Sequence, residues 1–258
     1  MAFIIGGHQR SGTTMLFRLC GTHRDLGITG EFRCFARLDC PLADHIAALQ
    51  TRWYETSFLW RINRRAPFPI KAAGGVFLAL YLLRLRRTVG SGAVTASRVE
   101  DALRWVFRKS VVGDKEPKYV FQLDSLSKIP DLKRIMIYRD GRDVVSSFLE
   151  AIRTRWKTFE AAKTLNTAAL VARRWVESMG SIERNRPALH VIRYEDFVRD
   201  PRSAADSLAA YLGVDPAGFR PAAVHDRSIG KYRKGLTAGE LDEVLSVAGD
   251  MLARLGYL

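Results

Sequence analysis

The sequence has few cysteines, few acidic residues and no long hydrophobic run. Its three cysteines, Cys20, Cys34 and Cys40, are an odd number without the spacing of metal ligands, which argues against a disulfide framework and against a metal site. We therefore expect free thiols in a reducing compartment, with the cytoplasm as the localisation. Because the N-terminus enters a predicted strand directly, we also expect no signal peptide.

The deficit of acidic residues leaves a strongly basic chain. The 258 residues include 41 Lys and Arg against 27 Asp and Glu, so the formal net charge is +14. This charge points to an anionic partner, and on charge alone a nucleic acid, an acidic membrane surface and a multiply phosphorylated cofactor all remain open. The length suits one sizeable α/β core with helical insertions rather than a second domain.

No hydrophobic run is long enough to span a membrane. The richest stretch, Phe68 to Leu85, is interrupted by Lys71 and Arg84, and its continuous apolar part, Ala72 to Leu83, has twelve residues, whereas a span needs about 20. The basic and apolar segment Tyr81 to Arg87 has three interpretations: a lid or acceptor wall, a membrane contact, or a core helix with a solvated basic edge. We favour the core helix.

What is present is a strand, a glycine-rich loop and a helix start near the N-terminus. Phe3 to Ile5 shows no polar alternation, which predicts a buried parallel strand. Gly7 and Gly12 allow the backbone to close around an anion, and the free N–H groups of the following helix point at the loop. The side chains that add donors are Arg10, Ser11, Thr13 and Thr14. A phosphate group is therefore expected at this helix start.

This loop departs from the nucleotide-binding pattern G-x-x-x-x-G-K-[ST]. Gly7 and Gly12 have the right spacing, but Thr13 stands where the pattern has lysine. Without that lysine the loop loses its grip on β- and γ-phosphates. The cation of this loop is instead Arg10, whose planar guanidinium can donate two hydrogen bonds to a terminal anionic group. For the loop taken alone, a strand-to-helix turn without any ligand remains the alternative.

Downstream of the loop, predicted strands alternate with predicted helices. Strands are expected at 25–28, 110–113, 132–138 and 189–193, and helices from Pro117, after Arg139, and at 159–184, 202–212 and 238–255. Between residues 41 and 108, the spacing of Ile46, Leu49, Trp53 and Trp60 predicts a helical insertion over the site. The alternation predicts a P-loop-like, three-layer α/β/α fold with a central parallel sheet.

Four segments beside predicted strand ends carry a family resemblance. They are the loop Arg10 to Thr14, Asp114-Lys115-Glu116-Pro117, Arg139-Asp140-Gly141-Arg142 with Ser147, and Val191 to Asp196. In order and character they resemble the sulfotransferases that use 3′-phosphoadenosine 5′-phosphosulfate (PAPS), the bacterial and tyrosylprotein types more than the cytosolic type. The resemblance runs from about residue 3 to the C-terminal helix and is weakest between residues 41 and 108.

The resemblance implies two separate anion sites for PAPS. The loop residues Arg10, Ser11, Gly12, Thr13 and Thr14 would hold the 5′-phosphosulfate. Arg139 and Ser147 are similar to the family's pair for the 3′-phosphate, and an arginine with a hydroxyl partner suits that anion. The alternative for such an arginine is a plain surface charge. Arg142 and Asp143 are expected to make structural pairs.

The resemblance also assigns a lysine and a tyrosine. Lys115 would lie beside the sulfuryl group, so that Arg10 and Lys115 are the cations at the leaving and the transferring group. The alternative for Lys115 is a salt bridge with Asp114 or Glu116. Tyr194 matches the family tyrosine near the adenine, and its alternative is ordinary packing with a helix cap.

A basic loop near the C-terminus resembles the family's final cofactor-covering segment. The alignment is loose there, because Arg233-Lys234-Gly235 looks like the cytosolic phosphate motif but differs in register. We favour Arg227 and Ser228 as cofactor contacts, with Lys231 and Arg233 as further candidates. The alternative is a solvated basic loop.

The general base is expected to be Glu31. Cytosolic sulfotransferases place a histidine two residues after the lysine that Lys115 resembles, and here that position is Pro117. Tyrosylprotein-type enzymes use a glutamate in a Gly-Glu turn after the second strand, which Gly30-Glu31 resembles. The alternative for Glu31 is a salt bridge with Arg33 or Arg10, and the reserve candidates for the base are His8 and His45.

The sequence thus predicts a single domain over residues 1–258, with a helical insertion at about 41–108. The expected reaction moves the sulfuryl group of PAPS to a hydroxyl, in preference to an amine, without a metal. One rival is a P-loop small-molecule kinase, and another is a non-enzymatic binder of nucleic acid or anionic lipid, although the arginines are spread over many predicted helices rather than gathered on one face. The acceptor, a small molecule or a peptidic or glycan hydroxyl, and the oligomeric state remain open.

Overall fold

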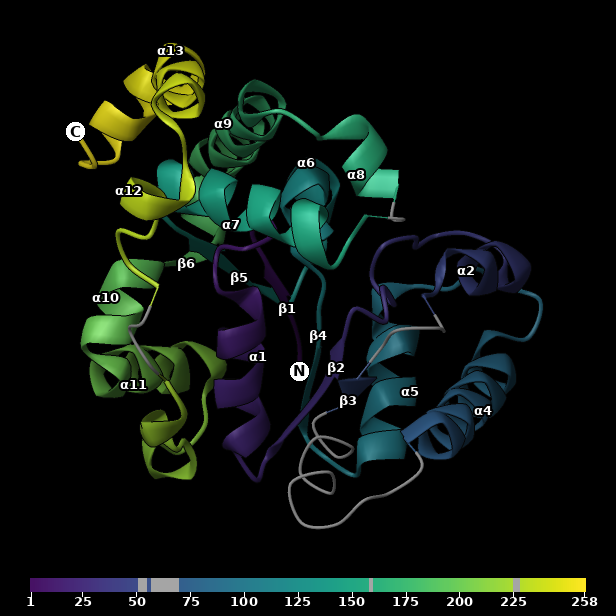
Figure 1. Ribbon diagram of the computed structural model, residues 1–258. Helices are drawn as coiled ribbons and strands as arrows, with labels where there is room; N and C mark the ends of the chain where they lie inside the picture. Colours follow the sequence, from purple (N-terminus) through teal and green to yellow (C-terminus); the bar gives the residue numbers. More distant parts are fainter. Residues whose placement is uncertain (51–54, 57–69, 158–159, 225–227) are drawn as a thin grey trace.

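The computed structural model describes residues 1–50, 55–56, 70–157, 160–224 and 228–258 (Figure 1). In these ranges six strands form one sheet in the order β3-β2-β4-β1-β5-β6. Their bounds are β1 Ala2–Gly6, β2 Leu26–Gly30, β3 Glu55–Thr56, β4 Val111–Lys115, β5 Leu132–Tyr138 and β6 His190–Arg193. Five strands run parallel, as predicted, and the short edge strand β3, which was not predicted, runs antiparallel to β2.

The central strand β1 shows why the sheet needs helices on both faces. Every residue of β1 is buried, because β4 and β5 pair with its backbone on the two sides and helices cover its side chains on the two faces. Since side chains alternate along a strand, Ile4 joins one apolar core while Phe3 and Ile5 join another on the opposite face. The chain leaves β1 toward β2 and later returns on its other side at β5, which makes the end of β1 a switch point where open α/β sheets bind ligands.

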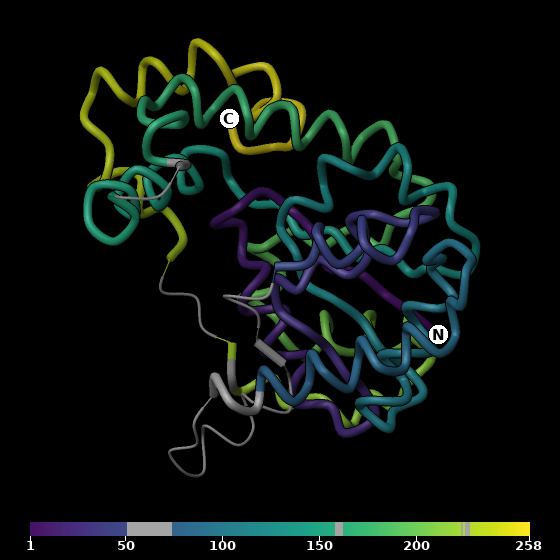
Figure 2. Tube along the Cα trace, turned by 90° about the vertical axis from the view of Figure 1, so that its right-hand side faces the viewer, coloured from purple at the N-terminus to yellow at the C-terminus, as the bar shows by residue number. Residues whose placement is uncertain are grey.

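Helices form the two outer layers and complete the predicted three-layer fold (Figure 1). Their bounds are α1 Thr13–Thr22, α2 Leu42–Ala48, α4 Ile70–Val89, α5 Ala96–Phe107, α6 Leu123–Leu126, α7 Gly141–Thr154, α8 Glu160–Thr164, α9 Ala168–Asn185, α10 Tyr194–Arg199, α11 Pro201–Leu212, α12 Tyr232–Gly235 and α13 Ala238–Arg254. Helices α1, α10 and α11 share the core of Phe3 and Ile5, whereas α5, α7 and α9 share that of Ile4. The C-terminal helix α13 runs alongside α9 (Figure 2).

Two predicted helices differ in the structure. The single helix predicted over 159–184 is wrong, because the chain forms α8 and then α9. Thr167 caps the start of α9 by accepting a hydrogen bond from the Leu170 N–H at 3.2 Å, and this new helix start separates the two segments. The helix expected from Pro117 begins as a 3-10 helix, Pro117–Gln122, with Glu116 as its cap, and continues as α6.

The predicted insertion is helical in its described part, with α2, α4 and α5. Trp53 and Trp60 lie outside the described residues. In α4, Tyr81 and Leu85 are buried while Arg86 and Arg87 are exposed, which supports the interpretation of this segment as a core helix with a basic edge. Among the described helices, none combines the length and the apolar character that crossing a membrane requires.

Candidate active site

The loop between β1 and α1 lies against the end of β5 and requires its glycines. Gly7 and Gly12 have φ values of +147° and +101°. A Cβ on Gly7 would lie 2.2 Å from the Ile137 carbonyl oxygen, and one on Gly12 would lie 2.5 Å from the ring of Tyr194. Arg10, at φ +72°, also has a left-handed backbone although it is not glycine. The loop therefore closes tightly over the end of the sheet.

The start of α1 leaves its backbone donors available. Gly12 is the N-cap of α1 and supplies no side-chain cap, whereas the N-cap of α7, Asp140, accepts a hydrogen bond from the Arg142 N–H at 2.9 Å. The first N–H groups of a helix lack partners within the helix and carry the positive end of its dipole. Of these two strand-to-helix turns, the one at α1 is therefore the one prepared for an anion.

A cavity of about 230 Å³ opens beside this helix start. Its described lining residues come from four segments of the chain and are Arg10, Gly12, Thr13, Thr14, Met15, Arg18, Arg139, Ser147, Tyr194 and Ser228. Three of them are arginines and none is acidic, so the cavity presents positive charge to a ligand. Four of the five predicted loop residues, all but the buried Ser11, thus line one cavity with the predicted pair Arg139 and Ser147.

The two predicted arginines meet different surroundings. The Arg10 Nε donates to the Ser147 hydroxyl at 3.0 Å, and its guanidinium lies 5.6 Å from the centre of the Trp156 ring. Burial, together with the nearby charge of Arg155, lowers the pKa of Arg10. Arg139 pairs with the buried Asp143 at 3.0 Å.

Arg139 also holds the cavity wall together. Its guanidinium lies 4.6 Å from the centre of the Tyr194 ring, and it donates to the Ser228 carbonyl. The carboxylate of Asp143 in turn accepts hydrogen bonds from the N–H groups of Gly230 and Tyr232 at 2.8 and 2.9 Å. The buried pair Arg139 and Asp143 thus ties the late loop to the first turn of α7.

Among the described residues, four buried side-chain polar atoms have no hydrogen-bond partner, and two of them belong to the segments that form this cavity: the Ser11 hydroxyl oxygen and the Arg139 Nε. The other two are the Arg33 Nε and the Ser127 hydroxyl oxygen. Buried polar atoms in folded proteins are nearly always hydrogen-bonded, so an orphaned pair calls for an explanation. The Ser11 and Arg139 atoms can both donate to an anion, and they lie on separate segments, one in the β1–α1 loop and one before α7. They suit a ligand with two anionic groups.

Glu31 and Lys115 form a second group at neighbouring strand ends. Lys115 is the last residue of β4 rather than a loop residue, and Glu31 directly follows β2. Because β2 and β4 are paired with Gly30 beside Lys115, the Lys115 Nζ reaches the Glu31 carboxylate at 2.6 Å. Lys115 therefore pairs with Glu31 rather than with Asp114 or Glu116, and Glu31 pairs with Lys115 rather than with Arg33 or Arg10. The lysine is buried, and the Glu31 side chain is 38% exposed.

The sequence and fold comparisons agree on the nature of this protein. The profile described as "Sulfotransferase family" matches residues 2–217. The chain belongs to the sulfotransferase family. It is similar to the nodulation protein NoeE of Sinorhizobium fredii, at 24% identity over 97% of this chain. The chain spans 64% of the length of that relative.

Solved sulfotransferase structures share the fold. The sulfotransferase domain from the curacin biosynthetic pathway matches at a TM-score of 0.62 and 17% identity, covering 100% of this chain and 98% of that one. The domain from the olefin synthase of Synechococcus PCC 7002 matches at 0.58 and 20% identity, covering 97% and 94%. These likenesses establish the P-loop-like α/β fold that the sequence predicts.

The predicted residues of the late loop differ in their position relative to the cavity. Lys231 and Arg233 are exposed and do not line the cavity, so their contact with a cofactor stays a prediction. Arg227 lies outside the described residues. Ser228, by contrast, lines the cavity. Arg18 also lines it and was missed, although its position one helical turn after Thr14 was a usable signal.

The two reserve histidines are both buried. His45 uses both ring nitrogens, one with the Arg37 carbonyl oxygen at 2.8 Å and one with the Tyr81 hydroxyl at 3.0 Å. His8 hydrogen-bonds the Gln9 carbonyl oxygen at 2.7 Å, and burial lowers its pKa to about 4. A histidine with a pKa this low is a weak proton acceptor at neutral pH. Both histidines are therefore poor candidates for the base, and Glu31 as the base stays a prediction.

Proposed function

We propose that this sulfotransferase moves the sulfuryl group of PAPS to a hydroxyl group, in preference to an amine, and leaves adenosine 3′,5′-bisphosphate. The observation that carries the proposal is the pair of orphaned donors, the Ser11 hydroxyl and the Arg139 Nε, beside one basic cavity. PAPS has two separated anionic groups, and the cavity offers donors on two separate segments. The family supports sulfuryl transfer, and the donor and acceptor are our inference.

In the proposed complex the β1–α1 loop binds the 5′-phosphosulfate. Ser11, Thr13 and Thr14 supply hydroxyl groups, and the start of α1 supplies free backbone N–H groups. Arg139 and Ser147 bind the 3′-phosphate, since both line the cavity and Arg139 has an unused Nε. Tyr194, packed between Gly12 and Arg139, forms the wall for the adenine.

The proposed transfer is an in-line displacement. The acceptor oxygen forms a bond to sulfur while the bond from sulfur to the 5′-phosphate oxygen breaks, and that oxygen keeps the electron pair. Glu31 accepts the proton that the acceptor hydroxyl loses. Arg10 and Lys115 stabilise the charge that grows on the leaving and transferring groups. Such preorganised contacts are worth about 2.7 to 4 kcal/mol each when they strengthen in the transition state.

The rival functions are less well supported by the residues. A kinase would need a lysine where Thr13 stands, because that lysine holds the β- and γ-phosphates. A binder of nucleic acid or anionic lipid would not need a carboxylate paired with a buried lysine at the strand ends in addition to a small basic cavity. Neither rival function explains why the β1–α1 loop and the segment before α7 each keep an unused hydrogen-bond donor.

Thermal unfolding with nucleotides tests the proposal. A ligand bound only by the native state at 100 times its Kd stabilises that state by about 2.7 kcal/mol, which raises the Tm of a chain of this size by about 5 to 10 °C. We expect this rise with adenosine 3′,5′-bisphosphate and a much smaller one with AMP or with ATP and magnesium at the same concentration. Equal shifts for ATP and the bisphosphate would favour the kinase instead.

The acceptor is open to direct screening. The helical insertion, with α2, α4 and α5 in its described part, would form the wall of the acceptor site. Phenols, sugars, peptides and amines are incubated with PAPS, and the product is detected by the mass of the added sulfuryl group. A sulfated hydroxyl compound is the expected product, and transfer to amines alone would correct the proposed acceptor class.

A further inference from the structure

The turn that carries Glu31 has an unusual backbone. Glu31 and Arg33 have φ values of +62° and +66°, and neither is glycine. Non-glycine residues occupy this left-handed region rarely, and they stay there only when the surroundings hold them. Two such residues within three positions therefore require an anchor.

The anchor is the buried carboxylate of Asp114, which is 0% exposed. One of its oxygens accepts hydrogen bonds from the Thr29 hydroxyl at 2.6 Å and from the Phe32 N–H at 3.2 Å. The other accepts from the Arg33 N–H at 2.8 Å and from the Tyr119 hydroxyl at 2.6 Å. Burial raises the pKa of Asp114, and these four hydrogen bonds oppose that rise.

The turn is also bound by the next residue of β4. The backbone carbonyl of Lys115 accepts the Glu31 N–H at 2.5 Å, while its side chain pairs with the Glu31 carboxylate at 2.6 Å. Tyr119 accepts the Phe35 N–H at 3.1 Å and so extends the hold along the turn. Two consecutive residues of one strand thus fix both the backbone and the side chain of the proposed base.

We propose that Asp114 is a positioning residue for sulfuryl transfer: its carboxylate sets the left-handed turn from Glu31 to Arg33 and thereby aims the Glu31 carboxylate at the acceptor. The proposal rests on the proposed function of Glu31 as the base. Because Asp114 is fully buried, it would not itself contact PAPS or the acceptor. It acts through the N–H groups of Phe32 and Arg33, which fix the position of the Glu31 carboxylate. This position matters because a displacement of about 1 Å in a reacting group can lower the rate about 10²-fold.

The substitution Asp114→Asn tests this hold at nearly constant volume. An asparagine has one acceptor oxygen, and its NH₂ group cannot accept a hydrogen bond. Whichever way the amide is turned, either the Phe32 N–H or the Arg33 N–H loses its acceptor. We expect turnover to fall about 10- to 100-fold, while the Kd for adenosine 3′,5′-bisphosphate stays within about twofold. Turnover is followed as bisphosphate released from PAPS, with 2-naphthol or water as the acceptor.

Thr29→Val is the matched control. It removes one hydrogen bond from the same carboxylate, with little change of shape, and leaves both N–H bonds of the turn in place. We expect its turnover to stay within about threefold of wild type, even where its Tm falls as far as that of Asp114→Asn. Equal losses of turnover in the two variants would overturn the positioning role, because general destabilisation would then explain both.

A double-mutant cycle with Glu31→Gln separates positioning from any other role. If Asp114 acts only through Glu31, adding Asp114→Asn to Glu31→Gln lowers turnover by no more than about twofold further. Independent, multiplying losses would overturn the positioning proposal alone. Normal turnover of Glu31→Gln by itself would instead refute Glu31 as the base, and the positioning proposal with it.

Hydrogen exchange of the wild-type protein provides a test that does not depend on the folding of a variant. We expect the amides of Phe32 and Arg33 to exchange as slowly as those within β4, because both are held by a buried carboxylate. Exchange of both amides at the rate of exposed loops would show that Asp114 does not hold the turn.

Discussion

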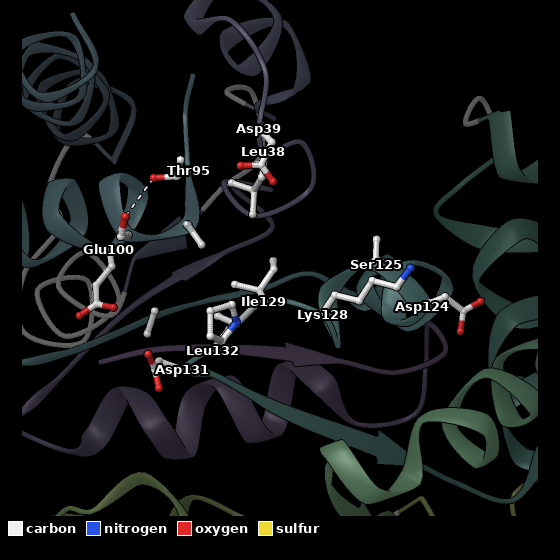
Figure 3. Close-up of a pocket in the computed structure, with 14 residues that line it drawn as sticks. Leu38, Asp39, Thr95, Glu100, Asp124, Ser125, Lys128, Ile129, Asp131 and Leu132 are labelled. Carbon is white, nitrogen blue, oxygen red and sulfur yellow. Dashed lines mark hydrogen bonds between the residues drawn. The ribbon is translucent and has the colours of Figure 1, made fainter. Parts of the chain in front are cut away.

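The parallel strands start at one end of the sheet, here called the amino edge, and finish at the other, the carboxyl edge. Each of these carries a hollow, and the smaller hollow has the features of a binding site. At the carboxyl edge, the basic cavity has a volume of about 230 Å³. At the amino edge, a hollow of about 740 Å³ is lined by residues that include Glu100, Asp124, Lys128 and Asp131 (Figure 3). Size alone would therefore select the wrong edge.

The difference lies in what the charged groups do. At the amino edge, Glu100 and Asp124 lie at opposite ends of the hollow (Figure 3). Glu100 pairs with the N-terminal amino group and with Arg104, and Asp124 pairs with Arg184. At the carboxyl edge, Arg139 is buried and keeps an unused donor. Convergent, buried and partly unsatisfied groups therefore mark the site better than volume does.

The largest expected effect at the carboxyl edge comes from Glu31→Gln. The variant keeps the shape of the side chain but cannot accept the acceptor proton, so turnover should fall about 10²- to 10⁴-fold. Affinity for adenosine 3′,5′-bisphosphate should stay nearly unchanged. Single-turnover transfer at saturating PAPS, beside calorimetry with the bisphosphate, measures both. Near-normal turnover would direct attention to His8, and a collapse of affinity would make Glu31 a structural residue.

The two arginines of the cavity should separate binding from transfer. If Arg139 holds an anion in both the ground and the transition state, Arg139→Ala should weaken binding of the bisphosphate about 10- to 100-fold and affect kcat less. It should also lower the Tm, because the buried Asp143 loses its partner. If Arg10 meets charge that develops during transfer, Arg10→Ala should lower kcat, about 10²- to 10³-fold, more than it raises the KM for PAPS. Calorimetry and steady-state kinetics measure the two effects. Changes under about twofold in both variants would mean that the site is misplaced.

A pH effect on stability should arise at the same edge, from His8. The pKa of His8 is about 4 in the folded protein, whereas the ordinary value of 6.5 applies to the unfolded chain. Between these values the unfolded chain binds a proton that the folded chain does not, so this residue's contribution is present above pH 6.5 and is lost as the pH falls toward 4. The loss approaches about 3 kcal/mol. Urea unfolding of wild type and His8→Gln at pH 7 and pH 4 measures the free energy of unfolding, which should change less with pH in the variant. The same change with pH in both proteins would contradict this prediction.

Much of the carboxyl edge was predictable from the sequence, because its residues follow their strands directly. The β1–α1 loop and the strand before Arg139 were recognised from local patterns, and both lie where a parallel sheet puts its loops. Arg139 directly follows β5 and precedes the N-cap of α7, and Ser147 lies within α7, so one strand-turn-helix unit carries both residues. Local pattern was sufficient for these residues, and they line the same cavity.

The pairing of Glu31 with Lys115 was not predictable in the same way. It depends on the order of the strands, with β4 beside β2, and on the register that sets Gly30 next to Lys115. The same order lets Asp114 reach the Glu31 turn. Neither the spacing of residues 31 and 115 nor their neighbours in sequence contains that information. The break at Thr167 and the edge strand β3 likewise depend on capping and on pairing that local periodicity does not show.

The smallest effect on turnover is expected from a substitution at the amino edge. This substitution tests directly whether the larger hollow takes part in the reaction. Asp131 lines the hollow of about 740 Å³ there, is exposed, and has a left-handed backbone with φ +59°. Asparagine tolerates that conformation, so Asp131→Asn removes one negative charge without straining the chain. Exposed substitutions of this kind change the free energy of unfolding by less than about 0.5 kcal/mol, and salt screens the lost charge beyond about 8 Å.

Turnover of PAPS and the Kd for adenosine 3′,5′-bisphosphate should therefore both stay within about twofold of wild type in Asp131→Asn. Measurements at 0.05 and 0.5 M salt separate a general change of surface charge from a local contact, because only the former fades at high salt. A tenfold loss of turnover that persists at high salt would mean that the larger hollow takes part in the reaction. In that case burial and unsatisfied donors would no longer suffice to tell the two edges apart.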